Sequence, residues 1–304
     1  MEIAITVAAA PSRDDLLLDV AAALQREFEG ALDFRWLAQG EAMDLILPSS
    51  EGAGAESGAA ELAYIKELVA SAAGDLPVDW CVQRARGRRK RMLIAGMDST
   101  IAGQESIDEM AGLKGVRAEA APVTERAMLG ELDFESSLRE RMPLLAGMTE
   151  AELKRVLDER LTLNAGARTL VQTMKAHGAH TVLASGGFTV FAEAVAARAG
   201  FAASRGNVLL WEDGRISGVA EPVCGREAKL AALRDEAAAH GIAPAEVIAV
   251  GDGANDLSML AAAGLSVAYR AKPFVEARTG ARIRHTDLTA LLYFQGYRRT
   301  CFAA

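Results

Sequence analysis

In the stretch Val247-Ile-Ala-Val-Gly-Asp-Gly-Ala-Asn-Asp256, an apolar run passes directly into a cluster of small, acidic and amide side chains. A second stretch, Met92-Leu-Ile-Ala-Gly-Met-Asp-Ser-Thr100, is built in the same way and adds hydroxyl groups. Such clusters, in which glycine lets the backbone approach a ligand, form sites for phosphate and for a hard cation. Both stretches are therefore expected to be strands that end at a binding site.

Further apolar runs alternate with helical patterns toward the C-terminus, at 181–184, 208–211, 247–250 and 265–268. This alternation predicts an α/β fold with a Rossmann-like parallel sheet covered by helices. In such sheets ligands bind at the carboxyl ends of the strands, where the polar clusters lie.

The rest of the chain suggests two further units. Residues 105 to about 170 have helical spacing and no convincing strand, which predicts a helical cap inserted between core segments 92–104 and 171–297 of a domain spanning 86–304. Expected strands at 2–8, 45–47 and 78–82 indicate a separate small α/β domain at 1–85, with a regulatory or dimerising role. The basic run at 84–91 is interpreted as a solvated linker, with an anion or nucleic-acid contact as the alternative.

Composition narrows the class of partner. A formal net charge of -8 argues against general attraction to nucleic acid or anionic membrane. No apolar run approaches the length of about 18 residues that a membrane span needs. The three cysteines form no CxxC pair, which fits a reducing cytoplasm without a zinc site. The four histidines also lack convincing partner spacing for a metal.

Several residues are candidates on chemical grounds alone. Asp252 is the expected ligand of Mg²⁺, with Asp256 and Asn255 bracing it and the phosphate. Ser185 and Gly186 follow the strand at 181–184, so a hydroxyl and exposed amides can hold phosphate oxygens there. The last candidate is Lys229, which lies at the opening of an expected helix, where its positive charge would offset a phosphoryl group.

In this order, Asp98-Ser-Thr100, Ser185-Gly-Gly187, Lys229 and the stretch 251–256 resemble the haloacid-dehalogenase-like phosphatases. Within that family, stretches 97–109 and 131–141 look like the phosphoserine phosphatases, which release serine from O-phosphoserine in the last step of serine biosynthesis. The resemblance covers roughly 92–297. Residues 1–85 are only loosely similar to the ACT-like domain that precedes the catalytic part of some members.

The resemblance implies roles for individual residues. Asp98 would protonate the leaving serine oxygen, activate water, and reach Mg²⁺ through its backbone carbonyl. Thr100 and Ser185 would hold the phosphate, while Lys229 would orient the nucleophile. Recognition of the substrate falls to four other positions: Glu105 for its ammonium, Arg141 for its carboxylate, and Met128 and Phe134 as the lid that excludes water.

Gly96 departs from the family pattern. The resemblance implies an aspartate there, two residues before Asp98, which attacks phosphorus to form an aspartyl-phosphate and also binds the metal. Losing a covalent nucleophile costs on the order of a million-fold in turnover when the residues act as a unit. The chain is therefore expected to hydrolyse phosphoserine barely or not at all.

Three origins of Gly96 stay open: a substitution in an active enzyme, a natural pseudoenzyme, or an error in the recorded sequence. The intact polar residues around it favour the first and the third. The functional alternatives are a module that senses phosphoserine or phosphate, and a phosphotransferase acting on another alcohol such as homoserine. A homodimer formed through 1–85 is a further option.

Overall fold

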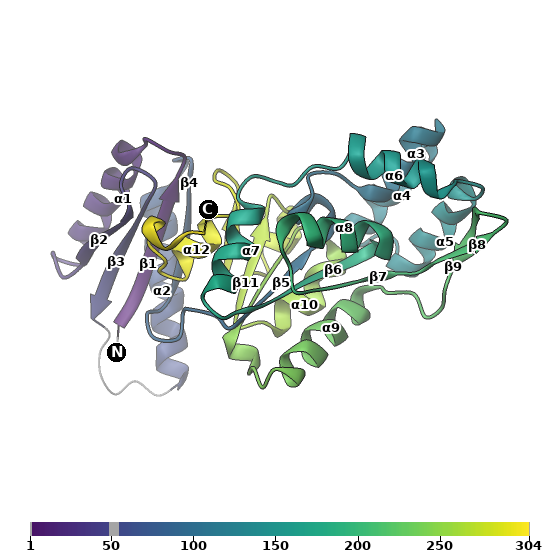
Figure 1. Ribbon diagram of the computed structural model, residues 1–304. Coiled ribbons are helices and arrows are strands. Elements are labelled where there is room, and N and C mark those ends of the chain that lie inside the picture. Colours follow the sequence, from purple (N-terminus) through teal and green to yellow (C-terminus); the bar gives the residue numbers. More distant parts are fainter. Residues whose placement is uncertain (1, 49–54, 304) are drawn as a thin grey trace.

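The computed structural model describes residues 2–48 and 55–303, and the first part of the chain forms a four-stranded unit. Its elements are β1 (Glu2–Ala9), α1 (Asp14–Glu27), β2 (Asp33–Ala38), β3 (Ala42–Pro48), α2 (Ala55–Ala73) and β4 (Val78–Arg84). The strands are antiparallel in the order β2-β3-β1-β4, and α1 packs against α2 (Figure 1). Ile3, Ile5 and Val7, which alternate along β1, face the core that these helices cover.

The strands predicted at 2–8, 45–47 and 78–82 are confirmed, but β2 was not predicted. Its sequence alternates charged and aromatic side chains, as in Asp33-Phe-Arg-Trp36, and it lies at the outer edge of the sheet. An edge strand with a partly exposed face carries a weaker apolar signal than a buried strand.

The remainder of the chain continues the same sheet. β4 meets β12 through one antiparallel pair, Trp80 and Arg282, which gives ten strands in the order β2-β3-β1-β4-β12-β11-β10-β5-β6-β7. The strands of this second part are β5 (Met92–Gly96), β6 (His180–Phe188), β7 (Ala203–Asn207), β10 (Val247–Gly251), β11 (Leu265–Tyr269) and β12 (Ala281–Ile283). They run parallel to one another, as the α/β interpretation predicts.

Helices cover both faces of the parallel strands. One face packs on α7 (Ala167–Ala176), α8 (Thr189–Ala199) and α12 (Ala290–Phe294). The other packs on α9 (Arg226–Ala239), α10 (Leu257–Ala262) and α11 (Pro273–Glu276). Because α7 contacts β6 and α8, it belongs with the core and crosses the boundary predicted at 170.

The cap stands over the carboxyl ends of these strands (Figure 1). It contains α3 (Ser106–Lys114), α4 (Arg117–Met128), α5 (Phe134–Leu145) and α6 (Glu150–Glu159), joined by the hairpin of β8 (Leu209–Glu212) and β9 (Arg215–Val219). The prediction that 208–211 is a strand of the parallel sheet is wrong, because β8 pairs only with β9. Asp213 and Gly214, both with positive φ, turn the chain back at once, and β7 occupies the expected place in the sheet.

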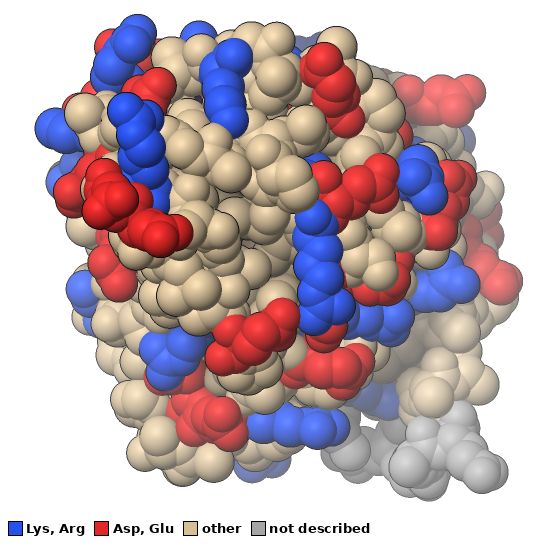
Figure 2. All heavy atoms as spheres, turned by 90° about the vertical axis from the view of Figure 1, so that its right-hand side faces the viewer, with Lys and Arg blue, Asp and Glu red and all other residues tan. Residues whose placement is uncertain are grey.

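The basic run at 84–91 connects the two units and has exposed arginines, as a solvated linker would, but it also makes specific contacts. Arg88 pairs with the buried Asp44 at 2.6 Å, Lys90 donates to the backbone carbonyl of Ala245 at 2.9 Å, and the Arg89 guanidinium lies over the ring of Tyr297. These residues fasten the first unit to the second. Figure 2 shows the opposite, cap end, where acidic and basic side chains are interspersed. Among the described helices, none has the length and apolar character needed to cross a bilayer.

Candidate active site

The stretches 92–100 and 247–256 end side by side. β10, β5 and β6 are neighbours in the sheet, and Asp252, the turn Met97–Ile101 and Ser185 lie at their carboxyl ends. Thr100 Oγ1 donates a hydrogen bond to Asp252 Oδ1 at 2.7 Å, and Ser185 Oγ donates to Asp98 Oδ2 at 3.4 Å. The structure thus brings together the polar clusters that the sequence placed at strand ends.

Lys229 adds a buried positive charge to this group. It lies in the first turn of α9, and its Nζ donates to Asp256 Oδ1 at 2.7 Å, with at most 3% of either side chain exposed. Burial alone would lower the pKa of Lys229, but Asp256, followed by Asp252 and Asp98, outweighs burial and raises it. The ammonium therefore stays charged among the carboxylates.

The surroundings of Asp252 disfavour its ionised form. Burial, and next the charge of Asp256, raise the pKa of Asp252 to about 7. The Oδ1 of its neighbour Asn255 is buried without a hydrogen-bond partner among the described residues. Hard oxygen donors whose charge Lys229 offsets only in part suit a divalent cation such as Mg²⁺, so these residues fit the ion that the family implies.

Asp98 is placed by the turn that follows β5. Ser99 has a φ of 55°, which turns the chain sharply, and the backbone N–H of Ser106 donates to Asp98 Oδ1 at 2.7 Å. Burial raises the pKa of Asp98, although the bonds from Ser106 partly oppose the shift. A carboxyl group with a raised pKa stays protonated at a higher pH than usual, which suits it to act as a general acid.

Glu105, at the start of the cap, faces the same cluster. Ser99 Oγ donates to Glu105 Oε1 at 2.5 Å. Burial, followed by the charges of Asp98 and Asp252, raises the pKa of Glu105 well above its ordinary value. A cation bound next to Glu105 would stabilise its ionised form, which is the interaction expected with a substrate ammonium.

Arg141 approaches from α5 and is 4% exposed. Its Nε donates to the Ser137 carbonyl at 3.1 Å, its Nη2 to Ser137 Oγ at 2.8 Å and its Nη1 to Thr124 Oγ1 at 2.8 Å. Thr124 in turn donates to Asp108 at 2.5 Å. Three of the five guanidinium N–H groups are thus used, which leaves two for a ligand. The supporting residues were not predicted, although the 137/141 spacing places both on one helix face.

Two side chains of the cap close the site against core glycines. A Cβ added to Gly186 would lie 2.5 Å from the Phe134 ring, and one added to Gly253 would lie 2.4 Å from Met128. A side chain at Gly186 would therefore displace the Phe134 ring, whereas one at Gly253 would require the flexible end of Met128 to move. Phe134 also packs against Gly225, whose added Cβ would lie 3.3 Å from the ring.

The residues described so far line one cavity that opens to solvent. It is lined by Asp98, Glu105, Ser106, Ile107, Thr124, Ala127, Met128, Phe134, Arg141, Gly186, Gly187, Lys229, Asp252, Asn255 and Asp256. Thr100 and Ser185 lie just behind it through their bonds to Asp252 and Asp98. Every predicted site side chain therefore lies in this region.

Two further residues shape this region: Gly187, which belongs to the predicted stretch Ser185-Gly-Gly187, and Asn207, which was not predicted. Gly187 donates its N–H to Ser185 Oγ at 2.8 Å, and its missing Cβ would fall 3.2 Å from Asp98 Oδ2. Asn207 Nδ2 donates to the Gly186 carbonyl at 2.7 Å, and its Oδ1 accepts from the N–H of Cys224. Asn207 thereby fixes the loop beneath Phe134. Asn207 belongs to no recognisable motif, so the sequence did not predict this role.

Gly96 occupies the strand end between these groups. Its φ of -62° and ψ of 150° are accessible to any residue, so the backbone does not require glycine. An added Cβ would lie 3.3 Å from both carboxylate oxygens of Asp256 and 3.5 Å from Thr100 Oγ1. A side chain can therefore be accommodated after a shift of a few tenths of an ångström, and it would project into the catalytic cluster.

A family model described as haloacid dehalogenase-like hydrolase matches residues 93–261, more than half of the chain. The chain belongs to the haloacid dehalogenase-like hydrolase family. Relatives of this hydrolase include the phosphoserine phosphatase of Albidiferax ferrireducens, 43% identical over 66% of this chain and 88% of that protein. The phosphoserine phosphatase of Streptomyces coelicolor is 39% identical over 77% of this chain and 58% of its own length.

Solved structures of this hydrolase family match both parts of the chain. A HAD family hydrolase from Salmonella enterica serovar Typhi superposes with a TM-score of 0.79 at 29% identity, covering 97% of this chain and 98% of that one. A substrate-bound phosphoserine phosphatase complex superposes with a TM-score of 0.65 at 33% identity, covering 68% and 98%. The first match includes the four-stranded unit, and the second is confined to about two thirds of the chain.

Proposed function

We propose that this chain has the site of a Mg²⁺-dependent phosphoserine phosphatase, and that Gly96 leaves it with little or no turnover. The observation that carries the proposal is one cavity with two charged poles. Glu105 and Arg141 lie on the cap side, while Lys229 and the aspartates lie on the core side. The relatives named phosphoserine phosphatase support the same assignment.

The charges of O-phosphoserine match these poles in number and sign. Its ammonium would meet Glu105, its carboxylate would take the two free N–H groups of Arg141, and its phosphate would lie near Lys229. Bidentate pairing explains why an arginine, held in one orientation by Ser137 and Thr124, suits the carboxylate better than a flexible lysine.

Asp252, through its carboxylate, and Asp98, through its backbone carbonyl, would hold the Mg²⁺ ion, which supplies charge neutralisation of the phosphate when bound. Asp98, with its raised pKa, would deliver a proton to the serine oxygen as that oxygen leaves. Phe134 and Met128 would keep bulk water away during this step. The nucleophile that attacks phosphorus would come from position 96, and Gly96 has no side chain to supply it.

A phosphoserine or phosphate sensor is the second candidate, and Gly96 itself favours it. Removing a carboxylate from the site removes one negative charge facing the phosphate, whereas Lys229 and Arg141 stay in place. We further propose that the four-stranded unit at 1–85 is a separate domain with a regulatory or dimerising role. Its own hydrophobic core supports this division.

Calorimetric titration of the unmodified chain with O-phosphoserine in Mg²⁺ tests the binding mode. We expect saturable binding that weakens at least tenfold in Arg141→Lys and in Glu105→Gln. Lysine cannot form the bidentate pair with the substrate carboxylate, and glutamine leaves the substrate ammonium without a counter-charge. Arg139→Lys, an exposed arginine on the same helix, is the matched control. Absence of binding by the parent, or equal binding by all variants, would reject the proposed site.

A further inference from the structure

A second group of ligand-type side chains lies at the far end of the sheet from the cavity. His180 is the first residue of β6, whereas Ser185 of the cavity lies further along the same strand. Glu236 and His240 lie in the last turn and at the end of α9, whose first turn carries Lys229. One nitrogen of each histidine and one oxygen of Glu236 all lie within 4.8 Å of one another.

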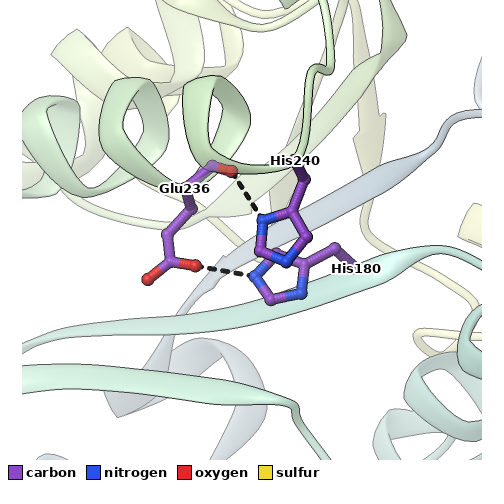
Figure 3. A group of neighbouring side chains, drawn as sticks. All are labelled: His180, Glu236 and His240. Carbon is purple, nitrogen blue, oxygen red and sulfur yellow. Dashed lines mark hydrogen bonds and ion pairs between the residues drawn. The ribbon is translucent and has the colours of Figure 1, made fainter.

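The hydrogen bonds of His240 leave one nitrogen suited to bind a metal (Figure 3). Its Nδ1 lies 2.9 Å from the backbone carbonyl of Glu236. A carbonyl oxygen only accepts, so Nδ1 carries the proton and Nε2 keeps its lone pair. Fixing the tautomer through the other ring nitrogen is how proteins prepare histidine for coordination.

Glu236 and His180 supply the other two donor atoms. His180 Nε2 lies 2.7 Å from Glu236 Oε2, and both side chains are largely buried. Arg205 pairs with the other carboxylate oxygen, Oε1, which leaves Oε2 turned toward the histidines. The two imidazole rings stack with centroids 3.7 Å apart. Figure 3 shows His180 Nε2 directed at the Glu236 carboxylate and His240 Nδ1 directed at the Glu236 backbone carbonyl.

The geometry points to a second metal site, in which His180, Glu236 and His240 bind one Zn²⁺-type transition-metal ion. Two imidazoles and one carboxylate are donors that Zn²⁺, Co²⁺ and Ni²⁺ accept in proteins. Mg²⁺ takes oxygen ligands, so it does not compete for two nitrogens. On binding, the ion takes the place of the proton on His180 Nε2: a neutral ring then carries its proton on Nδ1, and an imidazolium ring releases one proton to solvent. Water completes the coordination on the side of the partly exposed His240.

This site would join β6, α9 and, through Arg205, β7 at the amino ends of the strands. No sequence motif indicates this site, because His180 and Glu236 are 56 residues apart. Only the spacing of four between Glu236 and His240 places two of the ligands on one side of a helix. The inference does not depend on the proposed phosphatase function.

Zn²⁺ titration of the full chain tests this inference, after chelator treatment and dialysis into excess Mg²⁺ that occupies the cavity. We expect one Zn²⁺ per chain, bound at least tenfold more weakly by His180→Gln and by His240→Gln. His285→Gln, a histidine outside the cluster, and Asp252→Asn, which disables the cavity's cation ligand, should bind Zn²⁺ like the parent.

Co²⁺ provides an independent readout, because its visible absorption reports nitrogen coordination at a site of low coordination number. The band should appear with the parent and vanish with His240→Gln. Because His240 lies at the exposed end of α9, this substitution should not unfold the protein, so a lost band would report lost coordination. Three results would overturn the inference: no Zn²⁺ bound in excess Mg²⁺, unchanged affinity in the His180→Gln/His240→Gln double variant, or loss of binding in Asp252→Asn alone.

Discussion

The Cβ atom that Gly96 lacks would lie 3.3 Å from both carboxylate oxygens of Asp256. Asp256 is itself fixed by Lys229, at 2.7 Å, and by the backbone N–H of Asp252, at 3.2 Å. A carboxylate at position 96 would thus join a buried group of acids that has Lys229 as its nearest cation. A carboxylate at position 96 would therefore both supply the nucleophile and add a negative charge to this buried group.

Gly96→Asp should destabilise the metal-free protein, because a further carboxylate is placed beside Asp256 and Asp252. We expect its free energy of unfolding in chelator to be about 1–2 kcal/mol below that of Gly96→Asn, which has the same shape without the charge. Mg²⁺ should remove most of that difference. Urea denaturation with and without Mg²⁺ measures it, and an equal stability of the two variants in chelator would contradict the proposed crowding of charge.

Asp252 should make the stability of the metal-free protein depend on pH. Its pKa is about 7 in the fold and 3.8 ordinarily, so the folded state holds the proton more tightly than the unfolded state. This contribution is greatest at low pH and is lost as pH rises from about 4 through 7. Asp252→Asn, which can still accept from Thr100, should gain stability over the parent progressively across that range. Parallel pH profiles of the two proteins would show that Asp252 is not the group responsible.

Lys229 should be essential to the folded site as well as to phosphate binding. Lys229→Met leaves Asp256 buried without its counter-ion, and we expect a loss of about 3–5 kcal/mol in the free energy of unfolding. The double variant Lys229→Met/Asp256→Asn should regain part of that loss, because the unpaired charge is gone. Losses that simply add in the double variant would show that the two side chains do not interact.

Gly186 should control closure of the cap. A methyl group there would meet the Phe134 ring at 2.5 Å, so Gly186→Ala should hold the lid open. In the Gly96→Asp background we expect kcat/KM for phosphoserine to fall about tenfold or more, as for a loss of about 1–3 kcal/mol of pocket contact. Gly218→Ala is the matched control, since its nearest neighbour would be Leu210 at 3.8 Å. Full activity of Gly186→Ala would mean that Phe134 does not close the site.

Most of the cavity could be predicted because strand ends of a parallel sheet meet at one edge. Asp98, Ser185 and Asp252 follow apolar runs, and their convergence follows from that rule alone. The prediction that 208–211 lies in the parallel sheet was wrong because an apolar segment does not specify its partner strand. The contact of Phe134 with Gly186 and the grouping of His180 with Glu236 depend on tertiary packing between distant segments, which leaves no periodic trace in the sequence.

Phosphate release from O-phosphoserine, measured side by side for the unmodified chain, Gly96→Asp and Gly96→Asn, shows whether position 96 alone limits turnover. We expect the unmodified chain and Gly96→Asn to be inactive or nearly so. Gly96→Asp should gain Mg²⁺-dependent turnover, with kcat higher by up to about a million-fold. If Gly96→Asp stays inert on phosphoserine and other small phosphomonoesters, or if the unmodified chain already equals it, the account of this site as a phosphatase that lacks its nucleophile is wrong.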